Sequence, residues 1–530
     1  MSLNFMYFRG QVERILEVNF RGLTFIGARY QLGFLCASFF VCFAVFLSES
    51  TSVYEQIDDA YISFRYAANF ANGHGLVFNL GERVEGFTNL LWVLLIALGI
   101  KAGVSAELVA HLLGFVFGCT LMLVAMLYVK ILLPKSHMWM SGLVPPLLLS
   151  SNSFSSWTAS GLETPMFATL VMLALIAHAK NNVKWTVIFC ILSTLTRPDG
   201  VITAAVLLGV PLIFRMAKCR TLRVSFKLWR PILIYSLFLM GLTLFRVVYY
   251  NSFLPNTFYA KVGGTSFEYA IRYVTTFLKD GPGFLLLLFP FALTSKSFRY
   301  GALLFFTIAA YILAVGGDVF MYGRYFLPIL PIMIGATLLG VSRIFKYSWV
   351  GGVIALAVVP LCILWNLYGP WPTQYGEPKS ANISTLYSIK RAHSRNSLAM
   401  FEDTAAAKHK IELLKSLDPP IETIALIGIG RIAFFSEYTV VDVLGLVDTH
   451  IARSAKVKPG VRLPGHQRTD SDYVFSRHPD AIFIPRKGDT AYFVLPAVQD
   501  LWDNPKLEEG YFYYEPFGPY LSNKYTSSVD

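Results

Sequence analysis

Two acidic residues, Asp58 and Asp59, stand side by side shortly after the first apolar segment of the chain. A carboxylate beside a membrane surface can act as a general base toward a hydroxyl group, which accelerates a reaction typically by about 10²–10⁴-fold. Adjacent residues do not share a face of a helix or strand, so we expect the two acids to have separate tasks. One would face an acceptor hydroxyl, and the other would bind substrate hydroxyls or orient an arginine. Both could instead cap a helix, a position that aspartate favours.

Four further motifs place polar residues beside apolar segments: "GLET", "LTRPDG", "LPNTFYAKVGG" and "GGDVFMYGRYFLP". Ionisable residues at membrane depth are costly and usually mark function. Carboxylates mixed with cations predict group transfer from a lipid phosphate, because cations bind the phosphate oxygens of the leaving group and carboxylates stabilise an oxocarbenium-like sugar. The predicted substrate-binding residues are Arg65, His74, Glu163, Arg197, Asp199, Asn256, Tyr259, Lys261, Asp318 and Arg324.

Most of these residues could also have a purely structural role, which stays open from the sequence alone. His74 lies in the turn sequence "NGHGL", which favours a surface position. Glu163 could lie in the cap region of a helix, and Arg197 and Asp199 could form a local ion pair in a turn. Asp318 could simply pair with Arg324. Lys261 and Arg324 could be side chains that reach from apolar surface to water.

The composition indicates a multi-pass α-helical membrane protein. The chain has 530 residues, of which 55% are hydrophobic and only 15% are charged, and its mean hydropathy is +0.52. Repeated apolar runs of about 17–25 residues fit helices that cross a hydrocarbon core about 30 Å thick. The net charge of +12 comes from basic residues at the ends of apolar runs. That pattern is typical of topology signals and argues against a nucleic-acid partner.

The distribution of basic residues predicts the orientation. Four arginines in the first thirty residues place residues 1–31 in the cytoplasm. Residues 32–367 then form a transmembrane domain of about eleven helices, with both acids in a first external loop at 49–105. Within this loop, residues 87–103 are expected to lie along the outer interface. All of the polar motifs fall on the same outer face, and the more polar residues 368–530 form a separate external domain.

The external domain has the pattern of a small α/β fold, with one motif that suggests a cofactor. In "IETIALIGIGRIAFF", Gly428, Gly430 and Ala433 match the spacing GxGxxA. A dinucleotide site needs a full helix inside a unit of about 30 residues. The next strand-like run starts at Thr439, which leaves barely two turns, so we predict a structural strand-to-helix turn and no cofactor. His450 and His466 lack partners at metal spacing, so no metal is predicted, although a divalent ion stays open.

Several of these motifs together resemble one group of GT-C glycosyltransferases, which includes the mycobacterial terminal arabinofuranosyltransferase. The matching stretches are "DDAYISFRYAANFANGHGLVFNLGERVEGFTNLLW", "SGLETPMF", "TRPDG", "PNTFYAK" and "GGDVFMYGRY". The resemblance covers roughly residues 55–525. It implies a GT-C fold, a decaprenyl- or undecaprenyl-phosphate sugar as donor, and an acid of the first external loop as base. That role is carried to Asp58, with Asp59 as its partner.

The resemblance therefore predicts transfer of a sugar, with arabinofuranose as the suggested one, to a cell-envelope glycan, glycoconjugate or glycoprotein. The reaction would take place at the periplasmic face of a bacterial inner membrane, without a nucleotide sugar. Three alternatives stay open: a polymerase or ligase of lipid-linked glycans, a non-catalytic scaffold, and a transporter or flippase. A transporter would carry its ionisable residues near the midplane of the bilayer.

Overall fold

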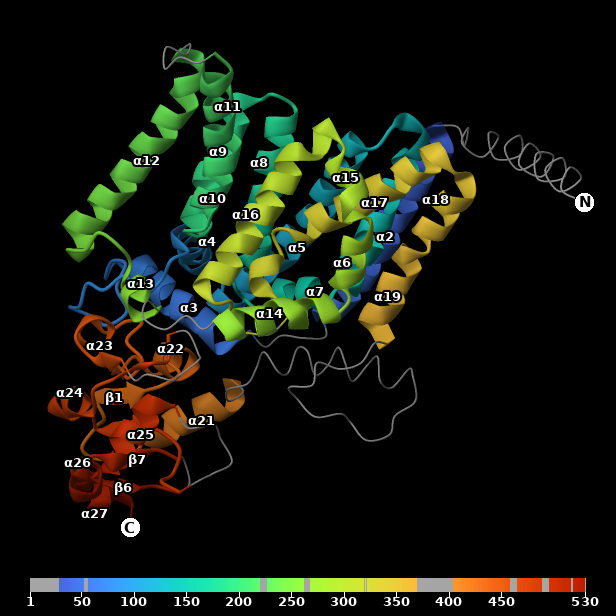
Figure 1. Ribbon diagram of the computed structural model, residues 1–530. Coiled ribbons are helices and arrows are strands. Elements are labelled where there is room, and N and C mark those ends of the chain that lie inside the picture. Colours follow the sequence, from blue (N-terminus) through green and yellow to red (C-terminus); the bar gives the residue numbers. More distant parts are fainter. Residues whose placement is uncertain are drawn as a thin grey trace, which may run out of the picture.

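The computed structural model describes residues 28–51, 56–219, 226–261, 267–318, 320, 322–368, 404–457, 465–488, 495–515 and 518–529. The predicted cytoplasmic segment lies almost entirely outside the described residues, as does the predicted start of the external domain up to residue 403. Figure 1 shows a helical bundle with a smaller α/β part, residues 404–529, packed against one of its ends. The predicted combination of an all-α membrane domain and a C-terminal α/β part is confirmed.

Seven helical stretches in the described residues are long and apolar enough to cross a membrane, or up to nine if each of two bent pairs counts as one span. The predicted count of about eleven is therefore not confirmed. The seven stretches lie in α2 (Ala28–Thr51), α5 (Ala106–Leu132), α10 to α11 (Gly200–Ala204 and Val210–Cys219, joined by the π-helical η2, Ala205–Gly209), α12 (Phe226–Tyr250), η4 to α16 (Lys296–Phe298 and Arg299–Val315), α17 (Leu330–Tyr347), and α18 to α19 (Trp349–Leu356 and Val358–Tyr368).

Two helix pairs bend sharply where glycine and proline interrupt the backbone. α7 (Asn152–Ala159) and α8 (Thr164–Ala179) meet at 117°, and α14 (Phe267–Lys279) meets the pair η3 (Pro282–Leu288) and α15 (Phe289–Leu293) at 83°. Gly161 and Gly281 occupy these breaks with φ of 80° and 116°, which other residues rarely adopt. The two breaks place short helices at the end of the bundle that faces the α/β part (Figure 1).

The region between Lys135 and Ala159 is not a single spanning helix. It consists of η1 (Lys135–Leu143), α6 (Val144–Ser150) and α7. The sequence "VPPLLLS" explains the division, because two consecutive prolines are tolerated only in the first turn of a helix.

α4 (Leu90–Lys101) is too short to span the membrane, as predicted: its 12 residues reach about 18 Å, against a hydrocarbon core of about 30 Å. α9 (Val183–Thr196) is a second short apolar helix.

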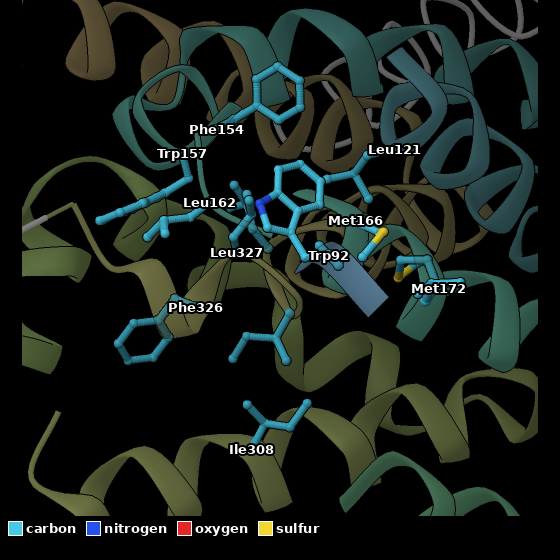
Figure 2. Packing of buried hydrophobic residues seen from close by; sticks show 14 of the residues in the cluster. Trp92, Leu121, Phe154, Trp157, Leu162, Met166, Met172, Ile308, Phe326 and Leu327 are labelled. Carbon is cyan, nitrogen blue, oxygen red and sulfur yellow. The ribbon is translucent and has the colours of Figure 1, made fainter. Parts of the chain in front are cut away.

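A buried core fixes α4 against the bend between α7 and α8. Figure 2 shows the Trp92 ring of α4 among Leu121 of α5, Phe154 of α7 and Met166 of α8. Trp92 is fully buried, and its indole Nε1 donates a hydrogen bond to the backbone oxygen of Gly161 at 3.1 Å. The core thus ties the loop between α7 and α8 to α4.

The α/β part contains a five-stranded sheet in the order β2-β1-β5-β7-β6. β1 pairs in parallel with β2 and β5, whereas β7 is antiparallel to β5 and β6. The strands are β1 (Thr423–Leu426), β2 (Thr439–Asp442), β5 (Ala481–Phe483), β6 (Tyr511–Tyr513) and β7 (Tyr520–Ser522), and β3 (Lys456–Val457) pairs with β4 (Arg468–Thr469) separately. The helices are α21 (Thr404–Lys415), α22 (Arg431–Ser436), α23 (Thr449–Arg453), α24 (Ser471–Ser476), α25 (Pro496–Asp503), α26 (Pro505–Gly510) and α27 (Thr526–Val529).

The two parts of the chain share one hydrophobic core. Tyr61 and Phe64 of α3 (Asp58–Ala71) belong to the same buried cluster as Ile429 and Ala433 of the α/β part. The aromatic rings of Tyr61 and Phe434 lie 5.6 Å apart. Burial of large apolar side chains from both parts at their junction stabilises the association in the way that a domain core does.

Candidate active site

Helix α3 begins at the acidic pair, at the end of the bundle where the α/β part packs (Figure 1). All eight residues from Ala60 to Ala67 are buried, and Ala60, Tyr61, Phe64 and Ala67 among them share one face at helical spacing. This face packs against α4 on one side and α22 on the other. Both acids are therefore held on a rigid, well-buried element at the boundary between the two parts of the chain.

The carboxylate of Asp58 is bound by the backbone of the α/β part. Its Oδ2 accepts a hydrogen bond from the backbone N–H of Gly430 at 3.0 Å, and its Oδ1 accepts one from that of Arg431 at 2.8 Å. Burial raises the pKa of Asp58, and these hydrogen bonds together with the charge of Arg431 oppose that shift. Each oxygen thus accepts one backbone hydrogen bond, which fixes the carboxylate and makes it a weaker proton acceptor than a carboxylate without such bonds.

Asp59 has a different environment, although it is the next residue. Its side chain is half-buried, and no side chain or backbone group in the described ranges forms a hydrogen bond with its carboxylate. Burial raises the pKa of Asp59 to about 6; the positive charges of Arg324 and Lys261 lower it, and the negative charges of Asp58 and Asp318 raise it. The carboxylate is mainly ionised at neutral pH and is available to accept a proton.

Two cations approach Asp59 from other elements. Lys261 ends α13 (Asn256–Lys261), and its side chain is exposed. Arg324 begins η5 (Arg324–Phe326), is buried, and forms a salt bridge with Asp318, with 2.7 Å between Arg324 Nε and Asp318 Oδ2 and 3.1 Å between Nη2 and Oδ1. The sequence had left open that Asp318 pairs with Arg324, and this pair is confirmed. Lys261 is the cation that a ligand can reach directly, whereas Arg324 acts mainly through its charge.

Glu163, Arg197 and Asp199 form a connected network under α3. Arg197 Nη1 lies 3.0 Å from Glu163 Oε1, and Arg197 Nε lies 3.0 Å from Asp199 Oδ1. Asn89 Nδ2 donates to Glu163 Oε2 at 2.9 Å and to Ser63 Oγ of α3 at 3.0 Å. The predicted ion pair of Arg197 with Asp199 is thus present, and Asn89 links it to the helix that carries the acids. Asn89 was not among the predicted site residues, although it directly precedes α4 in "GFTNLLW".

Three predicted substrate-binding residues hold the α/β part instead. Arg65 donates to the backbone oxygens of Phe78 at 2.8 Å and Tyr438 at 2.6 Å, and also to that of Ala433. Asn256 Nδ2 lies within hydrogen-bond distance of the backbone oxygens of Gly445, Leu446 and Asp448, at 3.0, 3.2 and 3.1 Å. The guanidinium of Arg453 lies 4.3 Å from the centre of the Tyr259 ring. Arg65, Asn256 and Tyr259 thus all contact the α/β part.

His74 does not join the acids. It is exposed in the turn that follows α3, and α3 has 14 residues and a length of about 20 Å. Asp59 lies at the other end of this helix. The surface-turn interpretation of the "NGHGL" motif therefore fits the structure, and His74 is not retained as a substrate-binding residue.

Two further residues that sequence reasoning missed lie in the motif that resembled a cofactor site. Gly430 and Arg431 supply the two N–H groups that bind Asp58, and Arg431 also donates to the backbone oxygen of Gln56. The motif joins β1 to α22, which has only six residues, as the predicted structural turn requires. The glycine spacing was the available signal, but the sequence could not indicate that the bound group is a carboxylate of the chain itself.

Comparison with known proteins gives one family model and several solved structures. The domain of unknown function DUF8728 matches residues 398–525. No curated protein matches the chain significantly by sequence. The chain is similar to ArnT from Cupriavidus metallidurans bound to undecaprenyl phosphate, with 13% identity, 78% of this chain and 86% of ArnT covered, and a TM-score of 0.49.

Two further solved structures are also similar to the chain. The oligosaccharyltransferase AglB from Archaeoglobus fulgidus, in complex with an inhibitory peptide and a dolichol-phosphate, is 13% identical, with 78% of this chain and 64% of AglB covered and a TM-score of 0.49. The arabinofuranosyltransferase AftD from Mycobacteria is 13% identical, with 86% of this chain and 35% of AftD covered and a TM-score of 0.43.

The arrangement can support proton transfer beside a phosphate. It combines Asp59, whose carboxylate accepts no hydrogen bond from the described residues, with an exposed ammonium, Lys261, and a buried guanidinium, Arg324, at one end of a helical bundle. Within the described ranges, no group of three or more His, Cys, Asp or Glu side chains is placed to hold a metal ion.

Proposed function

We propose that this protein is a GT-C glycosyltransferase that transfers a sugar from a polyprenyl phosphate to a cell-envelope glycan or glycoconjugate. The observation that carries the proposal is the environment of Asp59: a carboxylate without a hydrogen bond from the described residues, close to the charges of Lys261 and Arg324. The motifs that resemble GT-C enzymes supply these three residues from separate parts of the sequence. That they meet at one end of the bundle supports a common task.

In the proposed reaction, Asp59 is the base. Its carboxylate accepts the proton of the acceptor hydroxyl while the hydroxyl oxygen forms a bond to the anomeric carbon of the donor sugar. The bond between that carbon and the phosphate oxygen breaks, and its electron pair leaves with the polyprenyl phosphate. Charge develops on the phosphate as the bond breaks, and Lys261 is placed to neutralise it. The assignment moves the base from Asp58 to Asp59, because both oxygens of Asp58 are engaged by the backbone.

The remaining charged residues position the site. Arg324 contributes positive charge near Asp59, and two of its nitrogens, Nε and Nη2, contact its partner Asp318. The network of Glu163, Arg197 and Asp199 reaches α3 through Asn89 and Ser63, and we assign it the task of fixing the start of this helix.

The positions of the charges favour an enzyme over a transporter. Asp59 lies at the start of α3, Lys261 at the end of α13, and Arg324 in the connection between α16 and α17. All three are at the ends of elements on the side of the α/β part, whereas a transporter carries its ionisable residues on broken helices near the midplane. The resemblance adds the finer proposals: arabinofuranose as the sugar, and the periplasmic face of a bacterial inner membrane as the location.

Mass spectrometry of the envelope glycans from a deletion strain tests the function. We expect one sugar residue to be lost in the deletion strain, restored by the wild-type gene, and still absent with Asp59→Asn. Loss of a single pentose would support arabinofuranose, and loss of a hexose would move the donor to another sugar. Unchanged glycans in the deletion strain would contradict the proposed activity.

A further inference from the structure

The turn that binds Asp58 is shaped for a close approach of two backbones. A Cβ atom at Gly430 would overlap the backbone oxygen of Asp58, and one at Gly428 would lie 3.3 Å from Asp58 Oδ2. The first turn of α3 and the turn between β1 and α22 are therefore in direct contact, and glycine is required at Gly430. The two N–H groups beyond this contact donate to the carboxylate, so the turn forms a fitted receptor for one side chain of α3.

Helix α3 also binds the opposite end of α22. The guanidinium of Arg65 donates to the backbone oxygen of Ala433 in α22 and to that of Tyr438 just beyond it. The end groups of a helix lack partners within the helix and must find them elsewhere. Here, Asp58 supplies the partners at the start of α22 and Arg65 supplies them at its end. One helix of the membrane part thus satisfies both ends of one helix of the α/β part.

Two asparagines extend this attachment along the α/β part. β2 is an edge strand, and the side-chain amide of Asn79 pairs with its Val440 in both directions, donating to the backbone oxygen at 2.9 Å and accepting from the N–H at 3.0 Å. Asn256 binds the turn that follows β2. Asn79 and Asn256 are both buried, so separation of the two parts would leave buried polar groups without partners.

The attachment divides the tasks of the two acids. Adjacent residues on a helix are about 100° apart around its axis. With Asp58 fixed toward the turn at Gly430, Asp59 is directed to the region of Lys261 and Arg324. Movement of the α/β part away from α3 would free the Asp58 carboxylate and remove the contact that sets the direction of Asp59.

We infer that Asp58 is a positioning residue that the Gly430–Arg431 turn holds in place, and that the α/β part is an obligatory component of the active site. The structural half of this inference stands on the contacts alone. The catalytic half, in which Asp59 alone of the pair acts on substrate, rests on the proposed function.

Hydrogen exchange of the full-length protein in nanodiscs tests the structural half. We expect Asp58→Ala and Gly430→Ala to speed amide exchange in residues 428–436 by about tenfold or more, because the amides of Gly430 and Arg431 lose their acceptor. Asp59→Asn should leave this exchange unchanged, as should Gly510→Ala, a control glycine at the end of α26 with open space around it. Unchanged exchange in Asp58→Ala would overturn the inference, and this variant decides the question if Gly430→Ala does not fold.

The pH dependence of lipid-phosphate release tests the catalytic half. The probes are polyprenyl-phosphate sugars extracted from the deletion strain, with its envelopes as acceptor. The residual rate of Asp58→Asn should still fall at acid pH, but the fall should occur at lower pH than in the wild type. The reason is that the variant loses a negative charge that raises the pKa of Asp59. Asp59→Asn should no longer show the fall in rate at acid pH. A fall in rate that persists in Asp59→Asn but disappears in Asp58→Asn would overturn the inference. If the wild type releases no lipid phosphate, the proposed function fails, and hydrogen exchange still decides the attachment.

Discussion

Glu163 and Arg197 form a buried salt bridge of 3.0 Å between the start of α8 and the end of α9. The second carboxylate oxygen of Glu163 accepts a hydrogen bond from Asn89, which also binds Ser63 of α3. The pair is therefore connected to the helix of the acids by two hydrogen bonds. Its role is positional, and its removal should affect both stability and activity.

Replacement of Glu163 by Gln should destabilise the protein. The variant loses a buried charge-assisted hydrogen bond to Arg197, typically worth about 1.5–3 kcal/mol, while Arg197 keeps its ion pair with Asp199. Thermal unfolding of the detergent-solubilised variant measures the change, and Glu412→Gln on the exposed face of α21 is the matched control. The double variant Glu163→Gln, Arg197→Met should lose more stability, because it also leaves Asp199 without its ion-pair partner. Equal melting temperatures for Glu163→Gln and wild type would show that the pair is not structural.

Transfer should depend on the ionisation of Asp59. The base is active when deprotonated, so the rate should fall as pH drops through about 6, the raised pKa of this carboxyl, and level off above it. The cations that act on it are Arg324 and Lys261, and the acids are Asp58 and Asp318. A rate profile measured between pH 4 and 9, at roughly saturating donor, checks this expectation.

Lys261→Met should move that profile to higher pH. The ammonium favours the ionised form of Asp59, so its loss raises the pKa and reduces the fraction of active base at neutral pH. The rate at high pH should also fall, because the leaving phosphate loses a cation. Lys456→Met, on an exposed strand of the α/β part, is the control and should behave as wild type. A profile that does not move would remove Lys261 from the site.

Asn256→Ala should loosen the α/β part without a direct effect on the acids. The variant loses hydrogen bonds to three backbone oxygens, and each buried group left without a partner costs about 1–3 kcal/mol. Hydrogen exchange of residues 445–453 should therefore become faster. Asn72→Ala, at an exposed position after α3, is the control. Equal exchange in the two variants would mean that Asn256 does not hold this turn.

His74→Ala should leave transfer unchanged. The side chain is exposed at the far end of α3 from Asp59. The same glycan assay that separates wild type from Asp59→Asn checks this result. A strong loss of activity in His74→Ala would return this histidine to the substrate-binding residues.

Much of the fold could be predicted from the sequence, because apolar length and turn residues are local signals. The long apolar runs became helices, and "IETIALIGIGRIAFF" became a strand, a turn and a short helix. The bends at Gly161 and Gly281 could not be predicted, since a glycine inside an apolar run does not by itself reveal a break. The three helical pieces between Lys135 and Ala159 were missed for a similar reason, although Pro145 and Pro146 marked the place.

The sequence indicated which charged residues belong to the candidate site, but it did not indicate the role of each one. The charged residues do meet at one end of the bundle, but Asp58 and Arg65 bind backbone groups that lie more than 360 residues away in sequence. Local patterns carry no information about such partners. Asp58 and Asp59 are chemically identical in the sequence, and only the position of the Gly430–Arg431 turn separates their tasks.

The most direct test of the central claim is the release of free polyprenyl phosphate by purified protein in nanodiscs that contain the lipid-linked donor and an envelope acceptor. The wild type should release lipid phosphate in step with sugar transfer, and Asp59→Asn should release it about 10²–10⁴-fold more slowly while it keeps the hydrogen-exchange pattern of the wild type. Release by Asp59→Asn at the rate of the wild type would contradict the account.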